Sequence, residues 1–328
     1  MHVLNYLWYS IVTASLVHAL PLPGDSAVGV IWTFPNGTWI ENLAVRQNGE
    51  VLCTSLTKAA LYMVNPFQHT AQLVHQFDQG DDLLGITEVE NDVFAIVSAN
   101  ISFTTSTAMP GSAALWRVDM AAWEQGMPNA VTLVSRLLDV GLPDGIVALP
   151  DQLGLALLAD AAKGRVWKVD VWTGEHSVAF QSELFRPNTS VLPLGIDGLS
   201  IWKDNLFFTN IARSVFGHVP ISQNGSATGP IQQIAETPFG DDFAIAVDGT
   251  AYVVGDNTLF GVDLEGSAKI LAGGPDDLTL EGATSAQFGR TSMDDGVLYI
   301  GTNGGLLSPV DGEIRGGQLL AINTKLFD

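Results

Sequence analysis

A motif that recurs along the chain constrains its fold more than any other feature. Each copy opens on a short apolar run, usually beside an acidic residue, and continues through tight turns into further apolar strands. In the clearest copy, residues 240–264, two adjacent carboxylates precede the run, and an Asp-Gly pair, typical of a two-residue hairpin turn, separates it from the next strand. The copies open in steps of 43, 60, 53, 44 and 43 residues, at Glu41, Leu84, Asp144, Asp197, Asp241 and Thr284.

A period of about 40–50 residues with about four short strands per copy is typical of β-propeller blades, because each blade needs neighbours to bury its faces. Six copies therefore predict an all-β, six-bladed propeller. Apolar strands at residues 28–34 and 318–323 lie outside the complete copies. Pairing them in the last blade would remove an exposed sheet edge. The two long steps contain polar insertions, residues 98–112 and 181–190, which we expect in loops on the rim.

The first 19 residues form an apolar stretch that ends in Val17-His18-Ala19, with residues typical of a cleavage site. This pattern predicts a secretory signal peptide, followed by a single propeller domain over residues 20–328. The stretch is too short and too often interrupted by polar residues for a membrane anchor, and no other segment could span a bilayer. Four glycosylation sequons also indicate a secreted or secretory-pathway protein, at Asn36, Asn100, Asn188 and Asn224.

The charge of the chain excludes one class of partner. With 35 acidic and 14 basic residues, the formal net charge is −21, whereas nucleic-acid binding depends on Lys and Arg neutralising phosphates. The charge suits the binding of cations instead. The one cysteine, Cys53, can form no internal disulfide, so we expect it in the core and expect packing to hold the blades together.

Polar residues at the openings of the copies form the candidate site. In a propeller, the innermost strand of each blade lines the central channel, so these residues would converge on one mouth. Converging carboxylates repel one another unless a proton, a cation or a basic partner compensates them, and oxygen ligands suit Ca²⁺ or Mg²⁺. The alternative is that Asp before Gly only forms a turn. The predicted mouth contains Glu41, Asn42, Asp144, Asp197, Asp241 and Asp242.

At these residues the chain resembles a known family. ENLAV, IDGLSIWKDNLFFTN and DDFAIAVDGTAYVV are similar to blade openings of the senescence-marker-protein/gluconolactonase family of six-bladed propellers. That resemblance implies a divalent metal at the mouth, held by Glu41 and Asp241, with Asp197 where the family has Asn. A substrate-binding Asn of the family falls near Pro143 here. These two differences argue against lactonase activity.

A second resemblance covers more of the motifs. WIENLAVRQNGEVL, PDGIVALP, DDFAIAVDGTAYV, GATSAQFGR and LYIGTNGG are similar to a secreted fungal branch of this superfamily. That branch includes hetero-Diels–Alderases of polyketide and terpenoid pathways, which join a quinone methide to a terpene alkene. The resemblance implies a small-molecule substrate and a cycloaddition that requires no cofactor.

A cycloaddition needs an apolar pocket that orients its reactants and a few polar groups that polarise them. The catalytic candidates are Glu41, Asp197, Asp241 and Arg290, and the candidates for substrate binding are Asn42, Asp144, Asn210 and Asp242. The tryptophans in predicted strands are expected to pack in the core, namely Trp32, Trp39, Trp116, Trp167 and Trp202. Three functions remain open: a hetero-Diels–Alderase, a metal-dependent lactonase that uses Glu41, Asp197 and Asp241, and a non-catalytic binding propeller.

Overall fold

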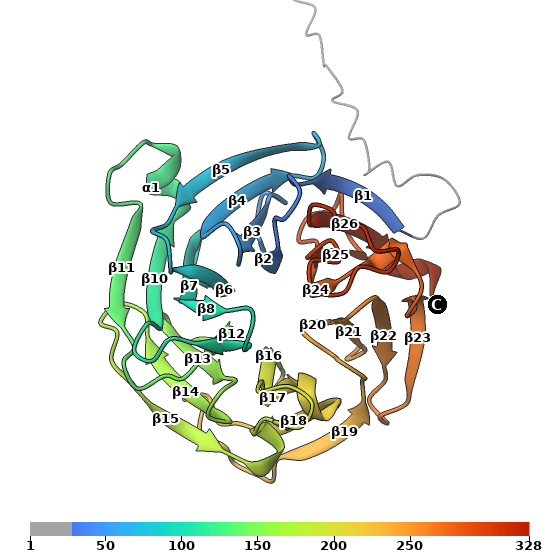
Figure 1. The fold of residues 1–328 in the computed structure, drawn as a ribbon. Helices are drawn as coiled ribbons and strands as arrows, with labels where there is room; N and C mark the ends of the chain where they lie inside the picture. The colour runs from blue at the N-terminus through green and yellow to red at the C-terminus, as the bar shows by residue number, and fades with distance from the viewer. Residues whose placement is uncertain (1–27, 328) are drawn as a thin grey trace, which may run out of the picture.

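The computed structural model describes residues 28–327, which form a closed ring of six four-stranded antiparallel sheets (Figure 1). The prediction of an all-β, six-bladed propeller is therefore confirmed. The signal peptide predicted for residues 1–19 lies outside the described residues. Within residues 28–327, no helix has the length and apolar character needed to cross a membrane.

In blades 1 to 5 the strands run in chain order from the channel outward. Blade 1 contains β2 (Ile40–Val45), β3 (Val51–Ser55), β4 (Ala60–Asn65) and β5 (Thr70–Gln76), and blade 2 contains β6 (Asp82–Glu90), β7 (Val93–Ala99), β10 (Ala114–Asp119) and β11 (Val131–Arg136). Blade 3 contains β12 (Pro143–Ala148), β13 (Leu155–Asp160), β14 (Arg165–Asp170) and β15 (His176–Gln181), and blade 4 contains β16 (Ile196–Trp202), β17 (Asn205–Asn210), β18 (Val215–Pro220) and β19 (Gln232–Glu236). Blade 5 contains β20 (Phe243–Ile245), β21 (Ala251–Gly255), β22 (Thr258–Val262) and β23 (Ala268–Gly273).

Blade 6 is built from both ends of the described chain (Figure 1). It contains β24 (Ala283–Phe288), β25 (Val297–Thr302), β26 (Gln318–Asn323) and, on the outside, β1 (Val28–Thr33). β1 pairs antiparallel with β26, with Val28 opposite Ile322 and Thr33 opposite Gln318. The predicted closure of the ring by the first and last strands is confirmed.

Helical segments are short and lie between strands. They are α1 (Met120–Glu124) and 3₁₀ turns at Glu183–Phe185, Ile211–Arg213, Leu278–Leu280 and Thr324–Leu326. The first polar insertion, residues 98–112, forms a small hairpin of β8 (Ile101–Ser102) and β9 (Thr107–Ala108), which is a sheet of its own. The second, residues 181–190, contains the 3₁₀ turn Glu183–Phe185.

The described core consists of apolar clusters between adjacent blades. Cys53 is fully buried in the cluster between blades 6 and 1, as expected of a small core residue. Four of the five tryptophans pack in or against these clusters without lining the main cavity, namely Trp32, Trp116, Trp167 and Trp202. Trp39 belongs to a core cluster but also reaches the cavity described below.

Candidate active site

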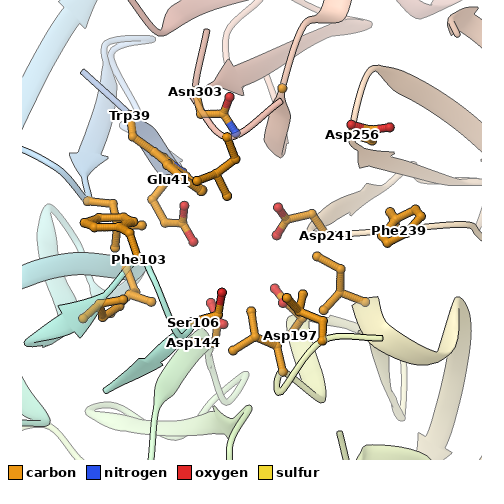
Figure 2. Close-up of a pocket in the computed structure, with 18 of the residues that line it drawn as sticks. Trp39, Glu41, Phe103, Ser106, Asp144, Asp197, Phe239, Asp241, Asp256 and Asn303 are labelled. Atoms are coloured by element: carbon orange, nitrogen blue, oxygen red, sulfur yellow. The ribbon is translucent and has the colours of Figure 1, made fainter. Parts of the chain in front are cut away.

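A cavity of about 430 Å³ lies at the end of the channel where the innermost strands begin. Glu41, Asp144, Asp197 and Asp241 line it, and Figure 2 shows their carboxyl groups facing a common centre. They come from blades 1, 3, 4 and 5, so residues as much as 200 positions apart in the chain share one site. We call this end of the channel the acid end.

Register places the four acids at one level. Glu41, Asp144 and Asp197 are each the second residue of an innermost strand, and Asp241 lies two residues before β20. In blades 3 and 4 the acid precedes a glycine inside the strand, so the alternative that these Asp-Gly pairs form turns is wrong. The glycine is needed for close packing, since a Cβ on Gly145 would lie 2.5 Å from the carbonyl oxygen of Asp197.

Threonine side chains fix the blades that carry the acids. The Thr209 hydroxyl of blade 4 donates to the carbonyl oxygen of Asp241 in blade 5. Thr284 Oγ1 of blade 6 donates to the carbonyl oxygen of Ile40 in blade 1 over 2.7 Å. These bonds join the backbone beside an acid to the neighbouring blade, which limits how far the carboxyl groups can move apart.

Burial and mutual repulsion shift the four acids toward their protonated forms. Burial raises the pKa of Glu41 to about 8, and the charge of Asp242 adds to the rise while the Trp39 side chain opposes it. Burial also raises the pKa values of Asp144, Asp197 and Asp241 well above their usual range, and the neighbouring carboxylates add to each rise. Near neutral pH the site therefore retains protons, and a protonated carboxyl group can donate a hydrogen bond.

Asn42 and Asp242 lie one residue further along the chain than Glu41 and Asp241 and do not line the cavity. The Asn42 amide donates to Asp242 Oδ2 over 2.9 Å, and the backbone N–H of Phe243 donates to Asp242 Oδ1 over 2.8 Å. Burial raises the pKa of Asp242 to about 7 despite these donors. The pair, predicted to bind substrate at the mouth, instead joins blades 1 and 5 behind the four acids.

The structure places two further candidates away from this cavity. Arg290 follows the far end of β24, where it lines a separate cavity of about 340 Å³, forms an ion pair with Glu88 and donates to the carbonyl oxygen of Val45 over 2.8 Å. A six-residue strand is about 20 Å long, so Arg290 cannot act beside Asp241. We call this end of the channel the opposite end.

Asn210 lies at the end of β17, beside the acid end, but its side chain serves the fold. It is fully buried, and its amide donates to the carbonyl oxygens of Leu184 and Arg186 over 2.8 and 3.0 Å. Its side-chain oxygen accepts from the backbone N–H of Arg213 over 3.2 Å. With these bonds made, Asn210 holds the loops between blades 3 and 4 and is not a substrate contact.

The remaining walls of the cavity are mostly apolar, and sequence reasoning missed them. Aromatic and aliphatic residues surround the acids, with a few polar groups at the edge and no Lys, Arg or His among the lining residues of the described chain. Figure 2 shows Trp39, Phe103 and Phe239 around the carboxyl groups. Apolar lining residues follow the same sequence pattern as core residues, so only the position of the two long insertions could have suggested them. The apolar lining is Trp39, Leu56, Leu84, Ile101, Phe103, Leu142, Leu192, Leu194, Ile211, Phe239, Ala283 and Leu307.

The four acids are not placed as ligands of one metal ion. Within residues 28–327, no group of three or more His, Cys, Asp or Glu side chains is placed so that it could hold a metal ion. Hydrogen bonding between the side chains of Asp197 and Asp241 adds to the rise in the pKa of Asp197 and opposes the rise in the pKa of Asp241. As they are placed, the carboxyl groups can hold protons, and a divalent cation would require them to move closer together.

The glycosylation sequons lie outside the blade strands. Asn36 and Asn224 are exposed in turns, and Asn100 and Asn188 are half-buried between strands.

Comparison with known proteins supports the resemblance found in the sequence. No family model matches the chain. A protein of Phoma sp named "Putative hetero-Diels-Alderase" is 26% identical over 315 residues, covering 86% of this chain and 90% of the relative. A protein of Sarocladium schorii with the same designation is 27% identical over 321 residues, covering 85% of this chain and 78% of the relative.

Solved structures share the fold at lower identity. A gluconolactonase from Xanthomonas campestris superposes with a TM-score of 0.64 at 12% identity, covering 94% of this chain and 92% of the other. A calcium-binding regucalcin from Agrobacterium tumefaciens superposes with a TM-score of 0.63 at 13% identity, covering 90% and 94%. The chain is thus a six-bladed propeller with the fold of gluconolactonase-like proteins, similar over most of its length to proteins named as hetero-Diels–Alderases.

Proposed function

We propose that this protein is a secreted enzyme of secondary-metabolite biosynthesis that directs an intermolecular hetero-Diels–Alder reaction. The reactants would be a quinone-methide-type intermediate and a terpene alkene. One observation carries the proposal: carboxyl groups with raised pKa values lie at the base of an otherwise apolar cavity. The names of the two curated relatives support it.

The cavity meets the physical needs of a cycloaddition. Its volume of about 430 Å³ lies in the range of about 300–1,000 Å³ that is typical of ligand pockets. Apolar walls would hold the diene and the alkene in contact, which removes much of the entropic cost of a bimolecular reaction. The reaction forms one C–C and one C–O bond and releases no leaving group, so the protein need not supply a nucleophile.

The acids would act on the oxygen of the diene. A protonated Glu41, Asp197 or Asp241 can donate a hydrogen bond to that oxygen, and the bond strengthens as negative charge develops on it. Asp144, in the same ring, can bind the substrate or share its proton with the others. The same acids can protonate a hydroxyl group that leaves as water when the quinone methide forms from its alcohol precursor, while an ionised carboxyl group of the cavity takes the proton of the phenol.

Stereochemistry provides the direct test. A naphthoquinone methide, generated by light-driven loss of water from 1-(hydroxymethyl)-2-naphthol, would be trapped by farnesol with and without the protein. We expect one enantiomer in excess with the protein and a racemic product without it, measured by chiral chromatography. A racemic product at the same rate in both reactions would favour the non-catalytic binding propeller.

A metal-dependent lactonase is the alternative proposal, favoured by the shared fold and by three carboxyl groups, Glu41, Asp197 and Asp241, in one cavity. Ca²⁺ or another divalent metal would be held by these residues after they move closer together. Lactone hydrolysis that a chelator abolishes, with stoichiometric metal in the purified protein, would establish this function and count against the cycloaddition.

Secretion is part of the proposal and has its own test. The mature secreted protein should begin near Leu20, and an N-glycosidase should reduce its mass if the sequons at Asn36, Asn100, Asn188 or Asn224 carry glycans. Retention of residues 1–19 in the purified protein would contradict a cleaved signal peptide.

A further inference from the structure

Above the four acids, the cavity has two chemically different walls. On the side of blades 1 and 2, the rings of Trp39 and Phe103 meet with centroids 5.9 Å apart and planes tilted by 41°; we call this pair the aromatic corner. Figure 2 shows both rings on the same side of the acids as Glu41. Apart from Asp144 and Asp197, the segments before and within blades 3 and 4 supply aliphatic side chains to the cavity, which we call the aliphatic wall, namely Leu142, Leu192, Leu194 and Ile211.

Phe103 occupies a position that the fold does not require. It follows β8 at the tip of the hairpin formed by β8 and β9, where its neighbours in sequence are Ser102 and Thr104. Its side chain is 39% exposed, so it is not a core residue, yet it packs on Trp39 and lines the cavity. A single aromatic residue on an otherwise polar tip, turned toward a cavity, indicates contact with a ligand.

Trp39 adds a hydrogen-bond donor beside Glu41. Its indole Nε1 and Glu41 Oε2 are both buried and form no hydrogen bond of normal length within residues 28–327, although the Trp39 side chain lies close enough to Glu41 to lower the pKa of its carboxyl group by hydrogen bonding. Both residues line the cavity, and Trp39 is 9% exposed. Buried donors and acceptors are almost always paired, and the loose match between these two side chains leaves the indole N–H able to donate to a polar group supplied from outside the chain.

We propose that the aromatic corner is the subsite for the planar, conjugated, oxygen-bearing reactant and that the aliphatic wall takes the alkene reactant. The planar molecule packs against Phe103 and Trp39, and its oxygen accepts a hydrogen bond from Trp39 Nε1 beside Glu41. The assignment rests on the proposed function in one respect, namely that two unlike reactants enter the same cavity.

Binding measurements on each probe alone test the assignment without relying on catalysis. Isothermal titration calorimetry would use 1-(hydroxymethyl)-2-naphthol as the planar probe and farnesol as the alkene probe. F103L retains apolar bulk and removes the ring, so we expect it to weaken naphthol binding about 3- to 10-fold and to leave farnesol binding unchanged. W39F retains a ring and removes the donor, and we expect about a 5-fold loss for naphthol alone.

Two further variants make the result specific. L194A shortens the aliphatic wall and should weaken farnesol binding more than naphthol binding. W172F is the matched control for W39F, because Trp172 is 43% exposed, packs under Arg117 and does not line the cavity. It should change neither affinity. Thermal unfolding of each variant would show that the differences in affinity do not come from loss of structure.

Several outcomes would overturn the assignment. They are an equal loss of both probes in F103L, unchanged naphthol binding in W39F, or no binding of naphthol to the unmodified protein. If the naphthol binds as expected but the product of the coupled reaction is racemic, the subsite stands and the proposed cycloaddition fails. If the product is enantiomerically enriched while F103L and W39F bind naphthol normally, the cycloaddition stands and the subsite fails.

Discussion

The same innermost strands form both ends of the channel, yet acidic residues lack a basic partner at one end and have one at the other. At the acid end, Glu41, Asp144, Asp197 and Asp241 face one another with no basic residue among the described lining residues. At the opposite end, Glu88 pairs with Arg290, which also donates to a backbone carbonyl group.

The two ends therefore differ in how their charged residues affect the stability of the folded chain. Carboxyl groups buried together without compensation raise each other's pKa values and destabilise the folded chain when they ionise. A paired Glu and Arg at a partly exposed site impose no such penalty. The acid end is therefore where a substrate, a proton or a cation relieves an unfavourable arrangement, and the comparison can be tested by neutralising each end in turn.

The largest expected effect is on catalysis. Neutralising the acid end with Asp197→Asn and Asp241→Asn together should lower the cycloaddition rate by about 10²–10⁴-fold, because an Asn amide cannot transfer a proton and donates a weaker hydrogen bond to the reacting oxygen than a protonated carboxyl group does. The rate would be followed by product formation under saturating reactants. The control is Glu88→Gln with Arg290→Gln at the opposite end, which should retain the original rate. An equal loss in the control would place the chemistry elsewhere.

A second prediction concerns a group of acidic residues whose negative charges are balanced by a buried arginine. Arg46 is 4% exposed in its side chain and pairs with Glu50, Asp92 and Glu124 at 2.6–2.7 Å. Arg46→Met would leave these carboxylates facing one another, and we expect the free energy of unfolding to fall by about 3 kcal/mol. Urea unfolding would measure the change. A loss that is as large at pH 4 as at pH 7 would contradict the charge explanation.

The third prediction is a pH dependence of stability that originates at the acid end. Burial raises the pKa of Glu41 from 4.5 to about 8, so between these values the folded chain binds more protons than the unfolded chain. Stability should therefore fall as pH rises through this range, by about 2–4 °C in Tm for each kcal/mol lost. Glu41→Gln cannot ionise and should reduce the slope. Identical Tm curves for the two proteins would refute the assignment to Glu41.

The smallest expected effect is at the opposite end. The side chain of Arg290 is 36% exposed, so solvent screens its ion pair with Glu88. Arg290→Ala should lower the free energy of unfolding by about 1 kcal/mol or less, well below the loss expected for Arg46→Met. Urea unfolding of both variants in the same buffer would compare them. A loss at Arg290 that equals the loss at Arg46 would show that exposure does not account for the difference.

Much of the fold and part of the site could be predicted from the sequence. Because the blades repeat one strand pattern, an acid at the start of an innermost strand recurs at the same level of the channel. For this reason Glu41, Asp144, Asp197 and Asp241 were correctly expected to lie together. The pairing of the first and last strands follows from the same repeat, since an outer strand was missing from the last copy.

Other features could not be predicted, for reasons that particular residues make clear. Arg290 and Asn210 were selected by residue type, but their roles depend on the far end of β24 and on loop carbonyl groups that no motif reveals. The sequence around Trp39 is typical of a core residue. In the structure Trp39 packs in a core cluster and also lines the cavity, which the sequence pattern does not indicate. Phe103 is carried to the cavity by a hairpin whose direction depends on packing rather than on local pattern.

The pairing of β1 with β26 has a consequence for synthesis. During translation β1 is synthesised long before β26, so this pairing cannot form until residues 318–323 have left the ribosome. Its docking completes a loop of nearly the whole chain, which is a slow step because distant segments must meet. In the folded protein this strand pairing has to break before the ring of blades can open. We therefore expect the protein to unfold slowly under conditions in which an open array of blades would unfold quickly.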